Sequence, residues 1–207
     1  MTPTNKPILF NTEMVRAVVN GKKTMTRRVI KVENPDEWQS KNDCRKHEEG
    51  SDVPCYLSRI NTTEFIGILY PKYDVGDILW VRETWAKISD YATPDTMVGL
   101  FDGYLYKATG EYHMGLKWRP SIFMPKEAAR IFLRVTDVKV ERVQDILCGD
   151  MQREGCIPET VTGGQYQQWH HDYWIPLWDS INAKRGYPWS SNPWVWVYSF
   201  KLMEDGV

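Results

Sequence analysis

The stretch "NGKKTMTRRVI", residues Asn20 to Ile30, places four cations and two threonines directly after a short apolar run. The residues before it, "NTEMVRAVV", predict a helix of about ten residues, which Asn11 or Thr12 can cap and whose valines form one apolar stripe. Gly21 stands where helices commonly end in a left-handed residue. The β-branched residues of "MTRRVIKV" then predict a strand. The cationic stretch is therefore expected at a turn from a helix into a strand.

The strand alternation predicts which side chains of this stretch share a face. Thr26 and Arg28 are two residues apart and point the same way in a strand. Lys23 joins them where the chain bends after the helix, so the three are expected to converge at the mouth of the strand. Lys22 and Arg27 are expected to point elsewhere, as solvated charges.

Such a trio suits chemistry on a polarised carbonyl or the binding of an anion. A threonine hydroxyl becomes a nucleophile when a base takes its proton. A lysine can be that base if burial or a neighbouring cation, here Arg28, lowers its pKa. A carboxylate would be needed to orient the lysine or to carry a proton. The trio alone favours the plainer interpretation of a solvated loop, because such trios are common on protein surfaces.

Length and composition restrict the classes of protein that the chain can represent. Its 207 residues suit one domain with insertions, and its 42% hydrophobic residues supply a core. A net charge of −1 gives no bulk attraction to nucleic acid, so any such contact needs a local patch. No apolar window approaches the roughly 18 residues of a membrane span, and the N-terminus lacks a signal-peptide layout. A cytoplasmic location without membrane contact is expected, with the four cysteines as reduced thiols.

Strand-like segments dominate the middle and the end of the chain. Alternating β-branched residues predict strands at 63–69, 78–85, 130–143 and 194–202. We expect these segments to form one closed or nearly closed sheet. Short helices are predicted at "DILCGDMQREG", which stops at Gly155, and at "QYQQWHHDYWIPLWDSIN", with a bend or break near Pro176.

Two stretches interrupt this pattern. Residues 33–62 are polar and without periodicity, which predicts an excursion on the surface. Residues 86–116 are also irregular, although their Gly and Tyr pairs suit a hairpin. The sequence therefore predicts a single domain over 1–207 of mixed α+β class, a small barrel-like β fold with flanking short helices and these two insertions.

The cationic stretch resembles a known family signature. "GKKTMTRR" is similar to the signature of ASCH-domain proteins, which is Gly, any residue, Lys, two residues, Glu or Thr, any residue, Arg. Gly21, Lys23, Thr26 and Arg28 fit it in register. The segments "VGDILWV", "RVTDVKVERVQDI", the "REG" after it and "NPWVWVYSFK" also resemble ASCH-like proteins often encoded by phages and prophages. The resemblance implies a PUA-like β-barrel and covers most of the chain outside 33–62 and 86–116.

One branch of this family consists of small bacterial amidohydrolases that remove acetate from N4-acetylcytidine. They use a lysine and a threonine of the signature, which Lys23 and Thr26 match, and a glutamate at the end of a later helix. Glu154, in "DMQREGC", is the matching position. The resemblance thus implies Lys23, Thr26 and Glu154 as catalytic residues. It implies neither a metal nor another cofactor.

Four residues outside the signature are candidates for substrate binding. Glu83 and Trp85 share a face of the strand "ILWVRETW", where Trp85 could stack on a nucleobase while Glu83 fixes a cation or a base edge. The alternative is a core tryptophan and a structural ion pair between Glu83 and Arg28. Trp118 and Arg119 in "KWRPSIFMP" suit a stacked base or a phosphate, and a packed tryptophan beside a solvated arginine fits equally well.

Metal binding has one weak candidate in the polar insertion. Cys44, His47 and Cys55 could supply three zinc ligands, but no fourth ligand is evident. His170 and His171 are adjacent on a predicted helix, where neighbouring side chains diverge.

The function expected from the sequence is binding and amide hydrolysis of a modified nucleoside or nucleotide. Gly21 and Arg28 would belong to the binding site along with the four candidates outside the signature. Two alternatives remain: a non-catalytic module that binds RNA or a nucleotide, and a phage accessory protein that acts through protein contacts.

Overall fold

The structure is a computed structural model in which the described residues are 4–41, 56–60, 65–88, 103–110, 116–156 and 166–203. The chain forms two compact units. The first combines Met1–Gly21, Asp77–Arg134 and Lys201–Val207, and the second combines Lys22–Gly76 and Val135–Phe200. The described part of the chain contains no helix with both the length and the apolar character needed to cross a membrane.

Three strands form the sheet of the first unit. Strand β1 (Asn5–Leu9) runs parallel to β6 (Ile78–Arg82), which pairs antiparallel with the start of β9 (Phe132–Arg142). Asp77 precedes β6, and its carboxylate accepts hydrogen bonds from the Thr4 hydroxyl and from the Lys6 ammonium, each at 2.7 Å. These bonds hold β1 beside β6.

Helix α1 (Thr12–Val19) follows β1 and has the predicted ends. The Asn11 side chain accepts a hydrogen bond from the Met14 N–H at 2.8 Å, which satisfies one unpaired donor of the first turn. Val15 and Val18 are buried. Gly21 has φ +71°, a left-handed conformation that glycine adopts at little cost.

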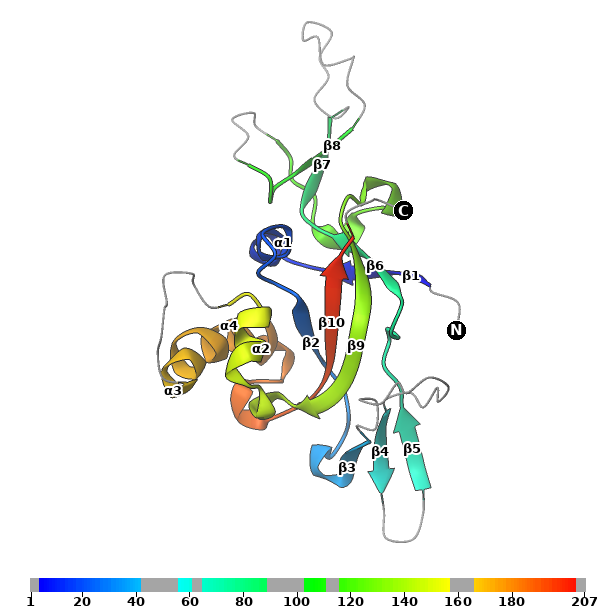
Figure 1. The fold of residues 1–207 in the computed structure, drawn as a ribbon, viewed down its shortest axis with the longest axis vertical. Coiled ribbons are helices and arrows are strands. Elements are labelled where there is room, and N and C mark those ends of the chain that lie inside the picture. The colour runs from blue at the N-terminus through cyan, green and yellow to red at the C-terminus, as the bar shows by residue number, and fades with distance from the viewer. Residues whose placement is uncertain are drawn as a thin grey trace, which may run out of the picture. The chain divides into compact units, whose positions relative to one another are not determined.

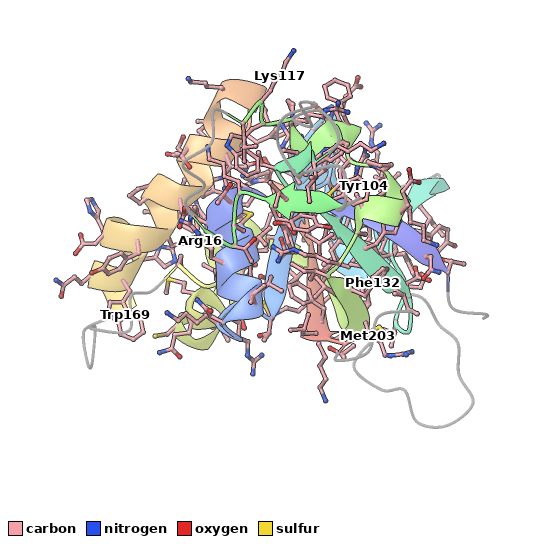
Figure 2. The ribbon with its side chains drawn as sticks, turned by 90° about the horizontal axis from the view of Figure 1, so that it is seen from above. Arg16, Tyr104, Lys117, Phe132, Trp169 and Met203 are labelled. Carbon is pink, nitrogen blue, oxygen red and sulfur yellow. The ribbon has the colours of Figure 1, made fainter. Side chains whose placement is uncertain are left out.

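The predicted hairpin of the first unit is also present. Strand β7 (Trp85–Lys87) pairs antiparallel with β8 (Tyr104–Tyr106). Tyr104, labelled in Figure 2, meets Trp85 edge to face with ring centroids 5.5 Å apart. Trp85 of this hairpin packs with Met124 and Ala128 in a small buried cluster.

In the second unit, β10 (Trp194–Leu202) lies between β9 and β2 (Met25–Val29), and β2 is antiparallel to it. Helices α2 (Cys148–Arg153), α3 (Tyr166–Trp169) and α4 (Ile175–Asn182) gather beside β2 (Figure 1). The core between the helices and these strands is rich in tryptophan and comprises Met25, Val143, Ile146, Met151, Trp169, Trp174, Trp178, Val195 and Val197. This core orients β2 and α2 relative to each other, and both carry candidate site residues.

The long predicted helix is interrupted at the expected place. A π-helical turn, His170–Trp174, separates α3 from α4, and Pro176 is the second residue of α4. Proline has no N–H to donate and is tolerated only in the first turn of a helix, so α4 begins anew beside it.

The predicted mixed α+β class is confirmed, with a sheet-rich core and few helices. The strand predicted at 63–69 is present, but its predicted place in one sheet with the other three segments was wrong. Residues 65–69 are a strand, β5 (Phe65–Leu69), but it pairs with β4 (Tyr56–Ile60) in a separate sheet with β3 (Trp38–Lys41). Part of the polar stretch 33–62 is therefore regular structure, because backbone pairing between strands needs no apolar alternation. In neither unit do the described strands close into a barrel.

Candidate functional site

The cationic stretch enters the second unit between β10 and the end of α2. The Thr24 N–H donates to the Arg153 carbonyl at 2.8 Å, and the Thr24 carbonyl accepts from the Phe200 N–H at 2.9 Å. β2 begins at the next residue and continues the antiparallel pairing with β10. These backbone bonds place the start of β2 directly beside the C-terminal end of α2.

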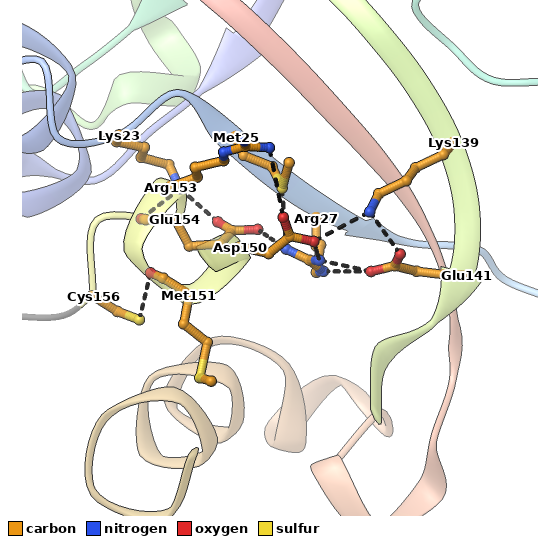
Figure 3. Close-up of polar contacts among 10 residues, drawn as sticks. All are labelled: Lys23, Met25, Arg27, Lys139, Glu141, Asp150, Met151, Arg153, Glu154 and Cys156. Carbon is orange, nitrogen blue, oxygen red and sulfur yellow. Dashed lines mark hydrogen bonds and ion pairs between the residues drawn. The ribbon is translucent and has the colours of Figure 1, made fainter. Parts of the chain in front are cut away.

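Lys23 and Glu154 meet at this junction, as Figure 3 shows. The Lys23 ammonium donates to the Glu154 carboxylate (Oε2) at 2.7 Å and to the Glu154 carbonyl at 3.0 Å. Both side chains are buried, with exposed fractions of 1% and 5%. Glu154 follows the last residue of α2, and Gly155 then turns the chain with φ +74°. The structure therefore brings together two of the three predicted catalytic residues.

Burial controls the protonation of Lys23. It lowers the pKa of the ammonium below its ordinary value, because the charged form loses its water. The Glu154 carboxylate opposes this effect, and the charge of Arg28 adds to it. A lysine with a lowered pKa is easier to deprotonate and can serve as a base.

Arg27 was predicted to be a solvated charge, and this prediction was wrong. Its side chain is only 1% exposed and is surrounded by three carboxylates. Its guanidinium donates to Glu154 Oε1 at 3.1 Å, to Asp150 at 2.9 Å and to Glu141 at 3.0 and 2.6 Å. It also lies over the Trp174 ring, 5.7 Å from the centroid. Arg27 is thus the centre of a buried ionic network.

Lys139 on β9 completes this network. Its ammonium lies 3.0 Å from Glu141 and 3.1 Å from Asp150. Lys23, Arg27 and Lys139 therefore face three carboxylates, so these six groups balance in charge, and the exposed Arg153 lies at the rim of the network, 3.8 Å from Asp150. Burial alone would raise the pKa of Asp150, but the charges of Lys139 and Arg27 bring it below its ordinary value. The carboxylates likewise raise the pKa of Arg27 against its own burial.

Thr26 and Arg28 lie on the other face of β2, as the alternation predicted. Thr26 is buried opposite Tyr198 of β10, and Arg28 is half-buried opposite Trp196. The ring of Tyr198 meets that of Tyr73 edge to face at 4.9 Å. Burial lowers the pKa of the Arg28 guanidinium, which the neighbouring Tyr73 and the Glu154 carboxylate partly offset. This face carries the predicted nucleophile among aromatic rings.

Cys156 lies just after the Lys23–Glu154 pair. Its thiol donates to the Met151 carbonyl at 3.1 Å. Burial and the charge of Glu154 raise its pKa to about 12. A thiol so rarely ionised is a poor nucleophile, so it does not compete with Thr26 for that role. Cys148 and Cys156 are both free thiols.

The other predicted binding residues, apart from Arg28, belong to the first unit. Glu83 is buried, and its carboxylate binds Arg130 in a two-pronged ion pair at 2.8 and 3.0 Å. Trp85 is 4% exposed, and the Arg119 guanidinium lies 5.0 Å from its ring centroid. A base stacking on that face would have to displace Arg119.

The two remaining predicted residues differ in exposure. Trp118 is half-buried, whereas Gly21 is exposed at the end of α1. Among these candidates in the first unit, the structure brings Trp85 and Arg119 together.

Within the described ranges, no group of three or more metal-ligating side chains is arranged to hold an ion. Cys44, His47 and Cys55 lie outside the described residues, so the zinc hypothesis stays a prediction. The sequence analysis missed Lys139, Glu141 and Asp150. Lys139 and Glu141 are two residues apart on the polar face of a predicted strand, which was the one available signal.

Comparisons of this chain with protein-family models, curated proteins and solved structures found no match.

Proposed function

We propose that this chain binds a modified nucleoside or nucleotide of the N4-acetylcytidine type and hydrolyses its amide. The observation that carries the proposal is the buried ion pair between Lys23 and Glu154, which joins two distant parts of the chain at the stretch resembling the ASCH signature. The same resemblance leads us to propose a PUA-like barrel, with β9, β10 and β2 as part of its wall.

In the proposed reaction, Thr26 attacks the amide carbonyl or positions a water molecule against it. Neutral Lys23 accepts the proton of the attacking hydroxyl and later returns it to the leaving amine. Glu154 orients Lys23 through the 2.7 Å hydrogen bond. One water molecule is consumed, either in the attack itself or to hydrolyse the acetyl group from Thr26, and the products are acetate and cytidine. The lowered pKa of Lys23 supports this role, because a base must first be unprotonated.

The test is turnover of N4-acetylcytidine by purified protein, followed as release of cytidine. Thr26→Val keeps the shape of the side chain and suits a strand, so we expect it to fold and to lose turnover by about a hundredfold or more. Thr26→Ser restores a hydroxyl and should recover part of the activity. Lys23→Ala and Glu154→Gln should also impair turnover, whereas Lys22→Ala, at an exposed neighbour, should not.

Equal turnover by wild type and Thr26→Val would exclude threonine as the nucleophile. No turnover by the wild type, together with binding of cytidine or RNA that Lys23→Ala weakens, would replace the enzyme by a non-catalytic binding module. The salt dependence of RNA binding would then measure how many phosphates are contacted.

A further inference from the structure

We propose that Arg27 is the positioning residue of the Lys23–Glu154 pair: it holds one carboxylate oxygen of Glu154 so that the other faces Lys23. The inference deepens the proposed function and rests on it for its catalytic meaning. Arg27 is not one of the signature positions matched by this chain. Its assignment comes from the contacts of its guanidinium alone.

The first step is the division of the Glu154 carboxylate between two cations. Oε2 accepts from Lys23 at 2.7 Å, while Oε1 accepts from Arg27 at 3.1 Å (Figure 3). Arginine presents its donors in a rigid planar fork, so a carboxylate that meets it is fixed in direction as well as in place. The orientation of Oε2 toward Lys23 therefore depends on Arg27.

The second step is that Arg27 is itself held on its other side. Its Nε and Nη2 both donate to Glu141, and Nη2 also donates to Asp150. Glu141 is on β9 and Asp150 is on α2, and Lys139 bridges the two carboxylates. The guanidinium is thus fixed from two elements, the strand β9 and the helix α2.

The third step concerns charge. A carboxylate shared with Arg27 stabilises the Lys23 ammonium less than one that serves Lys23 alone. The groups that face Lys23 are Glu154 and Cys156 after α2 and Arg28 on β2. Without Arg27, both oxygens of Glu154 are free to turn toward Lys23, so the carboxylate stabilises the ammonium more strongly although its direction is no longer fixed. Lys23 should then hold its proton to a higher pH and be a base less often at neutral pH.

The test compares three variants with the wild type. Arg27→Gln removes the charge and leaves the network with one excess negative charge, so it can also unfold the protein. Arg27→Gln with Glu141→Gln removes the arginine and its closest partner, which keeps the charges balanced. Arg153→Gln is the matched control: it removes the same charge next to Glu154, from a side chain that is 62% exposed and lies 3.8 Å from Asp150.

The readout is the titration of the Lys23 side chain by NMR of protein labelled in its lysines, with the signal assigned by its loss in Lys23→Met. We expect the Lys23 titration in the double variant to move up by about one pH unit. Arg27→Lys, which keeps the charge without the fork, should move it less. Arg153→Gln should leave it unchanged. A merely structural role would change stability without moving this titration.

An unchanged Lys23 titration in the folded double variant would overturn the proposal. So would an equal shift in Arg153→Gln, because the effect would then be one of general charge. The titration needs no substrate, so its result is separate from the hydrolysis assay. If the wild type hydrolyses N4-acetylcytidine, the double variant should also move the rising, acid-side limb of its pH profile to higher pH by the same amount, because that limb reports the pKa of a base that must be unprotonated.

Discussion

Lys23 carries an ammonium group to a position where only 1% of its side chain meets water. Moving a charge out of water has a large unfavourable free energy, and the attraction of the Glu154 carboxylate offsets only part of it. The pKa of Lys23 therefore lies below its ordinary value of 10.5. The unfolded chain does not share this effect, so Lys23 links stability to pH.

The first prediction concerns that link. Between the lowered pKa of folded Lys23 and 10.5, the unfolded chain binds more protons than the folded one, so the free energy of unfolding rises with pH. The gain is at most about 1.4 kcal/mol per pH unit within this window. Chemical denaturation at several alkaline pH values measures it as the difference between the wild type and Lys23→Met.

This difference cancels other titrating groups, such as the tyrosines Tyr73 and Tyr198, whose pKa values burial raises. If the wild type loses stability relative to Lys23→Met as the pH rises, Glu154 outweighs burial and the direction argued here is wrong.

The second prediction concerns Cys156. Its pKa of about 12 means that a very small share of the thiol is ionised at pH 8. The thiolate is the reactive form, so alkylation by iodoacetamide should be roughly a thousandfold slower than that of an ordinary thiol. Mass spectrometry of the peptide that contains Cys156, against a free cysteine peptide, measures the ratio. Equal rates would show that the thiol is not shielded as the structure has it.

At the scale of elements, the site depends on a strand and a helix end that meet through their backbones. β2 follows the left-handed turn at Gly21, and a side chain added there would meet nothing within 4 Å. Any penalty for a substitution at Gly21 is therefore one of backbone conformation alone. A substitution at Gly21 therefore tests the backbone conformation of the turn between α1 and β2 without a change in packing.

The third prediction compares a glycine in a left-handed turn, Gly21, with a glycine inside a helix, Gly149. Gly21→Ala should lower the free energy of unfolding by about 1 kcal/mol, because alanine is strained at φ +71°. Gly149→Ala, in α2 and also without a neighbour within 4 Å, should raise it by about 0.5 kcal/mol. Urea denaturation of both variants checks the signs. A stabilising Gly21→Ala would mean that the turn is not left-handed.

The elements also show what the sequence could and could not predict. Helix α1 was predictable because its cap and its valine spacing are local signals. The alternation of β2 correctly separated Arg27 from Thr26 and Arg28. It could not say that Arg27 is buried, because the carboxylates that surround it are 114 to 127 residues away in the chain. Strands β3 and β4 were missed because backbone pairing leaves little trace in polar side chains, so the predicted strand β5 was assigned to the wrong sheet.

The whole molecule raises the question of whether its sheet closes. In the second unit, β2 has β10 on one side and no further strand on the other among the described residues. Antiparallel strands direct alternate N–H groups to each side. The Ile30 N–H donates to the carbonyl of Trp194, the first residue of β10, at 2.9 Å, which sets the phase. Residues an even number of positions from Ile30 therefore point their N–H groups toward β10.

The fourth prediction follows from that phase and distinguishes an open sheet from a closed barrel. In an open sheet, the amides of Thr26 and Arg28 are bonded to β10 and should exchange with solvent deuterium on the order of tenfold or more slowly than those of Arg27 and Val29. Burial of the Arg27 side chain does not cancel this contrast, because its N–H lies in the plane of the sheet. Amide exchange followed by NMR resolves the four residues one by one. Equal protection of all four would mean that another strand pairs with the outer edge of β2 in solution, as closure into a PUA-like barrel requires.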